Sequence, residues 1–136
     1  MSIPDYHHSL TGPFWQGAAQ HELRLSWCRP CAQAIWYPQA ACPHCGAALH
    51  WHVLSGDALL ITWSEVAAGL NPHFSEAYIS ALVSPVEAPT VRLVTRMVQC
   101  AAQDLRCDMP VTVRFEKLQQ LHGEPYVAPC FTVPQG

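Results

Sequence analysis

Four cysteines have the spacing of a metal site. Cys28 and Cys31 form one Cys-x-x-Cys pair, and Cys42 and Cys45 form a second pair after ten intervening residues. Two thiolates from each of two turns can occupy the corners of one tetrahedron at about 2.3 Å from a zinc ion. Four protein ligands leave no position for water or substrate, so we expect one zinc ion with a structural role. Iron in the same set of four thiolates is chemically possible, because geometry alone does not separate the two metals.

A thiol–disulfide role fits the two pairs less well than a metal does. A thioredoxin-like motif has one such pair at the start of a helix, whereas Pro38 and Pro43 interrupt any helix here. The total of seven cysteines is odd, which argues against a secreted disulfide framework. An unpaired cysteine is most often a small buried hydrophobe, and this is the expectation for Cys100, Cys107 and Cys130.

Other residues with catalytic potential do not form a recognisable motif. The sequence lacks a Gly-x-Ser-x-Gly nucleophile elbow, a P-loop and a Gly-x-Gly-x-x-Gly dinucleotide motif. Cys100, Cys130 and His73 are unlinked candidates for a nucleophile or a base. An enzyme that works alone therefore ranks lowest among the functional interpretations.

A loop and two arginines are candidates for contacting a ligand or a partner. Asn71, His73 and Phe74 place polar groups beside an aromatic ring in a long connection between predicted strands, where a ligand mouth could form. An ordinary turn with a buried Phe is the alternative. Arg92 and Arg96 fall on one face of a predicted strand and could hold an anion such as a phosphate, or be ordinary exposed arginines.

The composition points to a protein partner. Only 12% of the 136 residues are charged while 50% are hydrophobic, so the chain can fold, and part of its surface is expected to face another protein. Aromatic residues often anchor interfaces, although here they could instead pack the N-terminal part against the rest of the chain. The candidates are Phe14, Trp15, Trp36 and Trp51.

The same composition disfavours nucleic acid and membranes. Seven basic residues stand against ten acidic ones, and Lys117 is the only lysine, so no basic field attracts a phosphate backbone. No stretch approaches the roughly 18 consecutive apolar residues of a membrane span, and residues 1–10 lack a signal-peptide pattern. We expect a cytoplasmic protein.

Hydrophobic periodicity predicts the elements that position the cysteines. Thr11 can cap a short helix that has a proline in its first turn and runs through Phe14, Trp15, Ala18 and Ala19. Residues 22–27 alternate as a strand that leads into the first cysteine pair, and residues 34–37 read as a returning strand that ends before Pro38. The two cysteine pairs would then lie on facing turns.

Five apolar runs separated by turn residues follow, which is the pattern of an all-β barrel or sandwich. In the fourth run, Val111, Val113 and Phe115 alternate with polar residues and are expected to point inward. A five-stranded antiparallel set after a small metal module predicts a mainly β protein with a partly open OB-fold barrel, and a short helical turn within 101–107. A sandwich is the alternative. The runs are residues 52–66 with a turn at 56–57, 78–83, 91–98, 111–115 and 126–133.

Several segments together resemble a known family. They are residues 14–17 (Phe-Trp-Gln-Gly), 21–25 (His-Glu-Leu-Arg-Leu), 36–38 (Trp-Tyr-Pro), 78–83, 93–95, 104–106 and 109–113. With the cysteine pairs, this pattern resembles the acyl-CoA-associated OB-fold proteins with an N-terminal rubredoxin-like zinc ribbon, the domain of unknown function 35 family. Asp108 departs from the pattern, because family members often have Gly there. Aspartate tolerates a left-handed backbone nearly as well as Asn does, so the fold is not affected.

The resemblance implies an organisation and a role. Residues 1–27 would form a helical arm and lead-in strand, residues 28–50 the zinc ribbon, and residues 51–136 the OB-fold domain. The resemblance carries over the four ribbon cysteines but no catalytic residue. It also implies a non-catalytic or co-catalytic subunit that acts beside a thiolase-like (thiolase, aldolase or acyltransferase) or hydratase subunit in lipid or aromatic acid metabolism. The OB domain would help to bind the CoA ester.

A nucleic-acid-binding or other binding module is the alternative function, since OB barrels bind single strands in other proteins. Such a groove needs a basic track beside stacking aromatic residues. The few arginines and single lysine do not provide that track.

Overall fold

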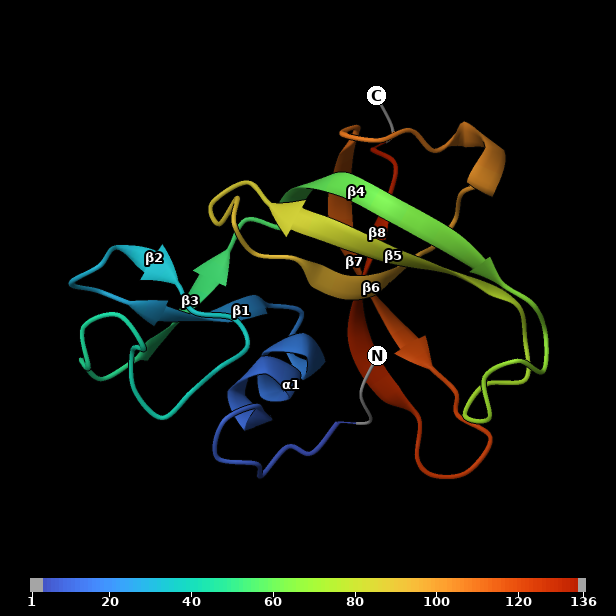
Figure 1. The fold of residues 1–136 in the computed structure, drawn as a ribbon. Helices are drawn as coiled ribbons and strands as arrows, with labels where there is room; N and C mark the ends of the chain where they lie inside the picture. The colour runs from blue at the N-terminus through green and yellow to red at the C-terminus, as the bar shows by residue number, and fades with distance from the viewer. Residues whose placement is uncertain (1–3, 135–136) are drawn as a thin grey trace.

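A helix, a small sheet and a barrel follow one another along the chain (Figure 1). The structure, a computed structural model, describes residues 4–134. Its elements are α1 (Gly12–Ala19), β1 (Leu23–Cys28), β2 (Gln33–Ala34), β3 (His50–Leu54), β4 (Asp57–Val66), β5 (Tyr78–Pro85), β6 (Leu93–Met97), the 3-10 turn η1 (Ala102–Asp104), β7 (Pro110–Leu118) and β8 (Tyr126–Thr132).

The segment just before α1 is held by a residue that the sequence pattern did not indicate. Thr11 is the N-cap, but its side chain makes no capping hydrogen bond, so this detail of the prediction is wrong. Instead, Nδ1 of His8 accepts the N–H of Leu10 at 3.0 Å and that of Thr11 at 3.3 Å. The imidazole thus satisfies donors that precede the first helical turn.

Gly17 lets α1 lie directly against the ribbon. A Cβ atom at this position would come within 2.6 Å of Cδ and 2.7 Å of Cγ of Arg24 on β1. Arg24 is itself held by Glu22, with Nη2 at 2.6 Å from Oε1. The close approach gives a physical reason for the Gly that ends the Phe-Trp-x-Gly segment.

The ribbon sheet has the strand order β2-β1-β3, and both pairings are antiparallel. The predicted returning strand 34–37 is too long, because β2 ends at Ala34. The next residue, Ile35, still donates its N–H to the carbonyl of Ser26 at 2.9 Å. After it the chain leaves the sheet, and the ring of Trp36 packs 5.0 Å from the ring of Phe14 on α1.

The first predicted barrel run, residues 52–66, is two strands of different sheets. β3 pairs with β1 in the ribbon, whereas β4 pairs with β5 and β7 in the barrel, so the prediction of one continuous run is wrong. Between them, the N–H of Ser55 bonds to Oε2 of Glu87 at 2.7 Å, and the carbonyl of Gly56 accepts the N–H of Val113 at 2.8 Å. The proposed domain limits at 27/28 and 50/51 stay predictions.

The barrel confirms the predicted fold class. Its strand order is β4-β5-β6-β8-β7, and it is closed by pairing of β7 with β4, where a partly open barrel was expected. All pairings are antiparallel except that between β6 and β8. η1 lies between β6 and β7, where the short helical turn was expected, and Asp108 takes the left-handed φ of +63° that its position requires.

The parallel seam between β6 and β8 is short. One register pair joins the two strands, Met97 with Phe131, and the N–H of Val98 donates to the carbonyl of Phe131 at 2.9 Å. Pro129 has no N–H to offer a neighbouring strand. Its carbonyl accepts the buried hydroxyl of Thr95 at 2.8 Å, so a side chain replaces a backbone contact in the seam.

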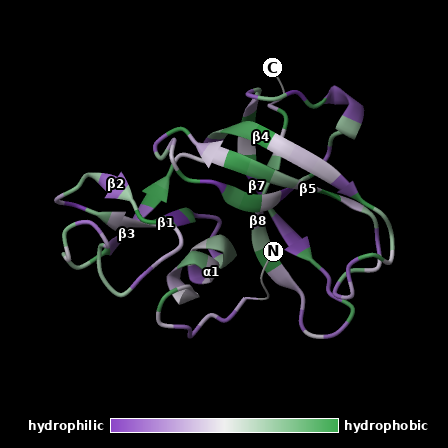
Figure 2. Cartoon of the chain, in the orientation of Figure 1, coloured by the Kyte–Doolittle hydropathy of each residue, from purple (hydrophilic) through white to green (hydrophobic). Residues whose placement is uncertain are grey.

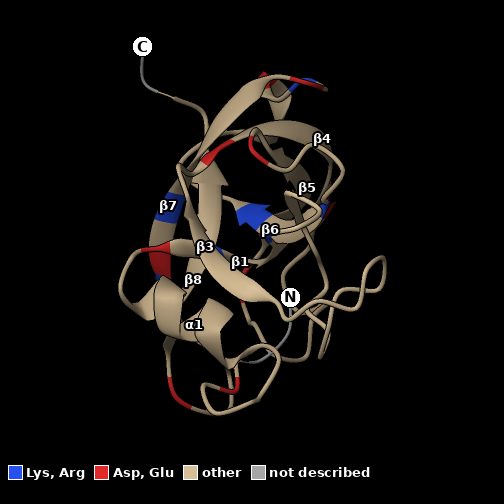
Figure 3. Cartoon of the chain, turned by 90° about the vertical axis from the view of Figure 1, so that its left-hand side faces the viewer, with Lys and Arg blue, Asp and Glu red and all other residues tan. Residues whose placement is uncertain are grey.

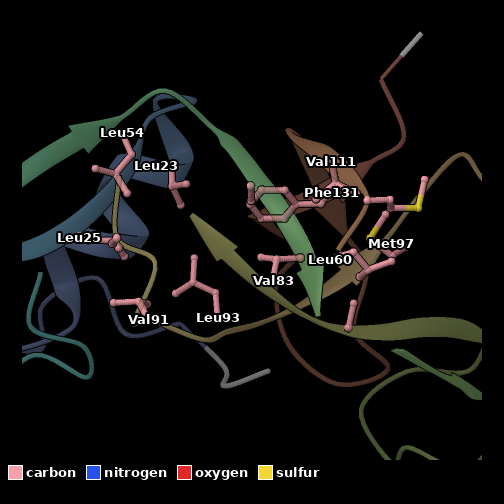
Figure 4. Packing of buried hydrophobic residues seen from close by; sticks show 14 of the residues in the cluster. Leu23, Leu25, Leu54, Leu60, Val83, Val91, Leu93, Met97, Val111 and Phe131 are labelled. Atoms are coloured by element: carbon pink, nitrogen blue, oxygen red, sulfur yellow. The ribbon is translucent and has the colours of Figure 1, made fainter. Parts of the chain in front are cut away.

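One apolar cluster runs from the ribbon sheet into the barrel (Figure 4). Leu23, Leu25 and Leu54 enter it from the ribbon, and Phe131, which is fully buried, lies in its barrel part. Hydrophobic colour is likewise concentrated on the barrel strands (Figure 2). The predicted inward alternation of β7 is confirmed, since Val111 is buried in this cluster while Val113 and Phe115 pack against it. The ribbon and the barrel therefore share a core.

Replacing Gly56 with Ala should destabilise the protein by at least about 2 kcal/mol. The added Cβ would overlap Cγ1 of Val113, and the backbone has a φ of +94°. Gly69→Ala is a matched control, because its φ is +82° but no atom lies within 4 Å of an added Cβ. Chemical denaturation should show a larger loss of unfolding free energy for Gly56→Ala than for Gly69→Ala. Equal losses would contradict a stabilising role for the close contact between Gly56 and Val113.

Candidate functional site

The four predicted metal ligands come together at the tip of the ribbon. Their sulfur atoms all lie within 4.8 Å of one another, with Cys28 at 3.5 Å from Cys45 and Cys31 at 4.0 Å from Cys42. A tetrahedron with zinc–sulfur bonds of about 2.3 Å has edges of about 3.8 Å. Disulfide-bonded sulfurs would be about 2.05 Å apart. The donor set and its spacing therefore fit a structural zinc ion.

The second cysteine turn shows how the local sequence positions a ligand. The N–H of Cys42 donates to the carbonyl of Ala47, and the N–H of Gly46 donates to the carbonyl of Cys42, both at 2.9 Å. Gly46 has a φ of +76°, which a residue without a side chain adopts at little cost. The N–H of His44 points at Sγ of Cys42 at 3.4 Å, which stabilises a thiolate. His44 thus supports the site through its backbone.

The thiols of the four-cysteine cluster differ in pKa. Burial raises the pKa of Cys42, but N–H groups of His44 and Cys45 outweigh it and lower this pKa to about 6. The pKa of Cys31 rises to about 12, chiefly through its hydrogen-bonding contacts with the sulfurs of Cys45 and Cys28. A dication binding here must therefore displace protons from neighbouring thiols.

The ribbon has little core of its own. Its separate apolar cluster contains only three buried residues, and two of them are metal-site cysteines. The buried residues are Cys28, Ile35 and Cys42, with Cys31, Ala47 and Leu49 packed against them. Metal ligation would supply the stability that such a small cluster cannot.

An aromatic cleft of about 250 Å³ lies where α1, the ribbon and the barrel meet. Phe14 packs edge to face on Trp15 at 5.0 Å, and Trp36 lies 5.4 Å from Tyr37. Tyr37 is 64% exposed at the cleft and Val94 is 45% exposed. The lining residues are Thr11, Phe14, Trp15, Trp36, Tyr37, Leu93, Val94, Thr95, Pro129 and Phe131.

The predicted ligand or partner residues separate into two groups. Phe14 and Trp15 line the cleft, whereas Phe74 lies against Arg96 on the outside of the barrel. Tyr37 and Val94 were missed in the cleft, and Tyr78 was missed beside Arg96. A Tyr directly after a Trp, and a Val between two arginines, carry no sequence signal that separates them from ordinary residues.

Arg92 and Arg96 do not converge on one anion. Nη1 of Arg92 donates to the carbonyl of Pro89 at 2.8 Å. The guanidinium carbon of Arg96 instead lies 4.7 Å from the ring centre of Phe74 and 4.0 Å from that of Tyr78. Arg92 precedes β6, which begins at Leu93, so the two arginines do not lie on one strand, and their charged groups have different neighbours.

The candidate loop closes over Arg96. Nδ2 of Asn71 donates to the hydroxyl of Tyr78 at 2.9 Å, and Oδ1 of Asn71 accepts the N–H of His73 at 2.9 Å. Phe74 is buried, as the alternative interpretation of this loop held. Asn71 and Phe74 therefore meet Tyr78 and Arg96 in one cluster.

The single cysteines differ in their surroundings. Cys130 is fully buried beneath α1, and burial raises its pKa to about 12, so it is a neutral thiol at physiological pH. Burial, with a smaller contribution from Asp104, also raises the pKa of Cys100. Cys107 is exposed, so the expectation of a buried hydrophobe is wrong there.

The fold and the site define a class of protein, a zinc ribbon joined to a closed OB-type barrel. Residues 15–50 match the family described as "ChsH2, rubredoxin-like zinc ribbon domain". This match and the barrel agree with the resemblance inferred from the sequence.

Solved structures share the fold over nearly the whole chain. The structure described as "Ltp2-ChsH2(DUF35) aldolase" has a TM-score of 0.78 and 24% identity, covering 96% of this chain and 98% of that one. A protein of unknown function from the DUF35 family of Sulfolobus solfataricus has a TM-score of 0.61 and 13% identity, covering 96% and 89%. No curated protein sequence matches. None of the helices in residues 4–134 has the length and apolar character needed to cross a membrane.

Replacing Cys42 with Ser should lower the zinc content from about one ion per chain to near zero, because three thiolates no longer enclose the metal. Elemental analysis of the purified variants tests this. Cys107→Ser is the control, since Cys107 is exposed and lies outside the cluster, and its zinc content should stay near that of the wild type. Retention of stoichiometric zinc by Cys42→Ser would contradict the assignment.

Zinc affinity should rise with pH between about 5 and 8, because protons compete with the metal for the thiols. The Cys42 pKa of about 6 makes this thiolate available first, whereas the thiol of Cys31, with a pKa of about 12, must lose its proton on binding. Competition with a chromophoric chelator at several pH values measures the dependence. An affinity that does not change with pH would exclude proton release on binding.

Proposed function

We propose that this chain is an accessory subunit of an acyl-CoA-processing complex and acts beside a thiolase-like catalytic partner. The observation that carries the proposal is the fold match to the structure described as an Ltp2-ChsH2(DUF35) aldolase, with a TM-score of 0.78 over 96% of this chain. The ribbon match to the ChsH2 family supports the same assignment. A hydratase partner is the second possibility within this proposal, and the partner's identity decides between them.

The aromatic cleft is the proposed contact with the CoA ester. Its volume of about 250 Å³ is below the 300–1,000 Å³ typical of sites that enclose a whole small molecule. A narrow, uncharged part of the ester suits it better, namely the acyl group with the adjoining pantetheine arm. The rings of Phe14, Trp15 and Trp36 would pack against that part.

The uncharged lining supports a pose in which the phosphates of the ester lie outside the cleft. None of the cleft-lining residues in the described part of the chain is charged. Lysine and arginine residues are sparse in the view of Figure 3, which also weakens the nucleic-acid alternative. In this proposal the phosphates of the CoA ester contact the partner, and the complex binds the ester more tightly than the isolated chain.

Affinity purification of the tagged chain from its native host, followed by mass spectrometry, should recover a thiolase-like subunit in about equal amount. We propose that the exposed rim of the cleft also contacts this subunit, so Val94→Asp, which adds a charge there, should weaken the association at least roughly tenfold. Val86→Asp is the matched control, since Val86 is 52% exposed and lies outside the cleft. Recovery of no such subunit, or equal weakening by both variants, would overturn the proposed interface.

Binding of an acyl-CoA should change the tryptophan fluorescence of the complex, because Trp15 and Trp36 both line the cleft. Tyr37→Ala removes an exposed part of the lining and should weaken binding several-fold. Free CoA, which lacks the acyl group, should bind more weakly than the ester. If the partner associates but Tyr37→Ala does not change the affinity for the ester, the subunit assignment stands. The cleft is then excluded as the ester site.

A further inference from the structure

The guanidinium group of Arg96 is the best candidate for an unassigned binding site. Arg96 lies on β6, and rings of Phe74 and Tyr78 pack against it on the outside of the barrel. These ring faces attract the positive charge, which explains how the group tolerates partial burial. A ring face is only a weak hydrogen-bond acceptor, so the N–H groups of Arg96 still require partners.

Two nitrogen atoms of Arg96 lack those partners. Nε and Nη2 are buried, and neither makes a hydrogen bond to any residue in the described range 4–134. Buried donors without an acceptor are uncommon in folded proteins and costly. Nε and Nη2 together form one side of the guanidinium fork, which is the side that binds a carboxylate through two parallel hydrogen bonds.

Neighbouring groups do not neutralise this charge. Tyr126 and Cys130 interact electrostatically with Arg96, but burial raises the pKa of each, so both are uncharged at neutral pH. On the adjacent β7, the carboxylate of Glu116 is already paired with Nε of Arg114 at 3.2 Å. The cluster therefore carries one uncompensated positive charge in apolar surroundings.

A loop covers the guanidinium group of Arg96, since the ring of Phe74 lies against it. Phe74 belongs to the connection between β4 and β5. Asn71 bonds to the hydroxyl of Tyr78, and the carbonyl of His73 accepts the N–H of Leu121 at 2.8 Å. Phe74 is itself buried, so opening of the loop would break these two contacts and expose its ring, while β5 and β6 could keep their pairing.

We propose that Arg96 binds the carboxylate of a small apolar monocarboxylic acid through Nε and Nη2, after the Asn71–Phe74 loop opens. A monoanion matches the single positive charge, whereas a phosphate dianion would bring an unneutralised charge into apolar surroundings. The aromatic rings of Phe74 and Tyr78 suit an apolar acid body. This site is separate from the cleft, and it does not depend on the function proposed above.

Calorimetric titration of the zinc-loaded full chain with benzoate tests the site. Benzoate should bind saturably, and benzamide, its neutral counterpart, at least roughly tenfold more weakly. Arg96→Lys should also weaken benzoate binding at least roughly tenfold, equivalent to about 1.4 kcal/mol, because Lys keeps the charge but lacks the fork. Arg106→Lys is the control at an exposed arginine and should bind as the wild type does.

Tyr78→Phe provides a test that leaves Arg96 itself unchanged. It keeps the ring on Arg96 but removes the hydroxyl that anchors Asn71, so the loop should open more easily and benzoate should bind at least as tightly as in the wild type. The proposal is overturned by any of four results: no saturable benzoate binding to the wild type, benzamide or inorganic phosphate binding as tightly, equal losses in Arg96→Lys and Arg106→Lys, or weaker binding by Tyr78→Phe.

Discussion

Apolar contact between the ribbon sheet and the barrel is the constraint on which the other features depend. Leu23 and Leu25 point to the same side of β1, and with Leu54 of β3 they are buried in the cluster that fills the barrel. Period-two alternation puts these leucines on one face, which the ribbon alone could not cover. The small module is thereby fixed in one orientation, and α1 can bridge it to β8.

The metal centre and the aromatic cleft are connected through the segment between the cysteine pairs. Trp36 and Tyr37 lie between Cys31 and Cys42, so the thiolate ligands fix both ends of the segment that forms one wall of the cleft. A structural metal can therefore determine the shape of the cleft. This arrangement gives a physical reason for placing a ribbon with almost no core of its own beside a barrel that has one.

Sequence patterns predicted features that depend on local spacing. The four cysteines and the apolar strands are such features, because each is encoded within a few residues. The assignment of residues 50–54 to the ribbon could not be predicted in this way. These residues have apolar positions like those of the following strand β4, and only their pairing with β1 distinguishes the two strands.

The site was predicted unevenly for the same reason. The cleft combines segments near residues 14, 36, 94 and 130, and their meeting depends on how α1 and the ribbon pack on the barrel. Phe74 and Arg96 were candidates in the sequence, but their contact with Tyr78 depends on the path of a long loop. The His8 imidazole at the start of α1 was likewise hidden, since a Thr at the N-cap is the more common device.

The short seam between β6 and β8 has a thermodynamic consequence. With one register pair and a hydroxyl from Thr95 in place of a ladder bond, it is the barrel contact that separates with the least disruption of backbone pairing. Strand β6 carries Val94 at the cleft and Arg96 in the aromatic cluster. If a molecule bound at the cleft or at Arg96 held this seam closed, it would change the affinity for a second molecule at the other position. Linkage then requires that each molecule change the affinity for the other by the same factor.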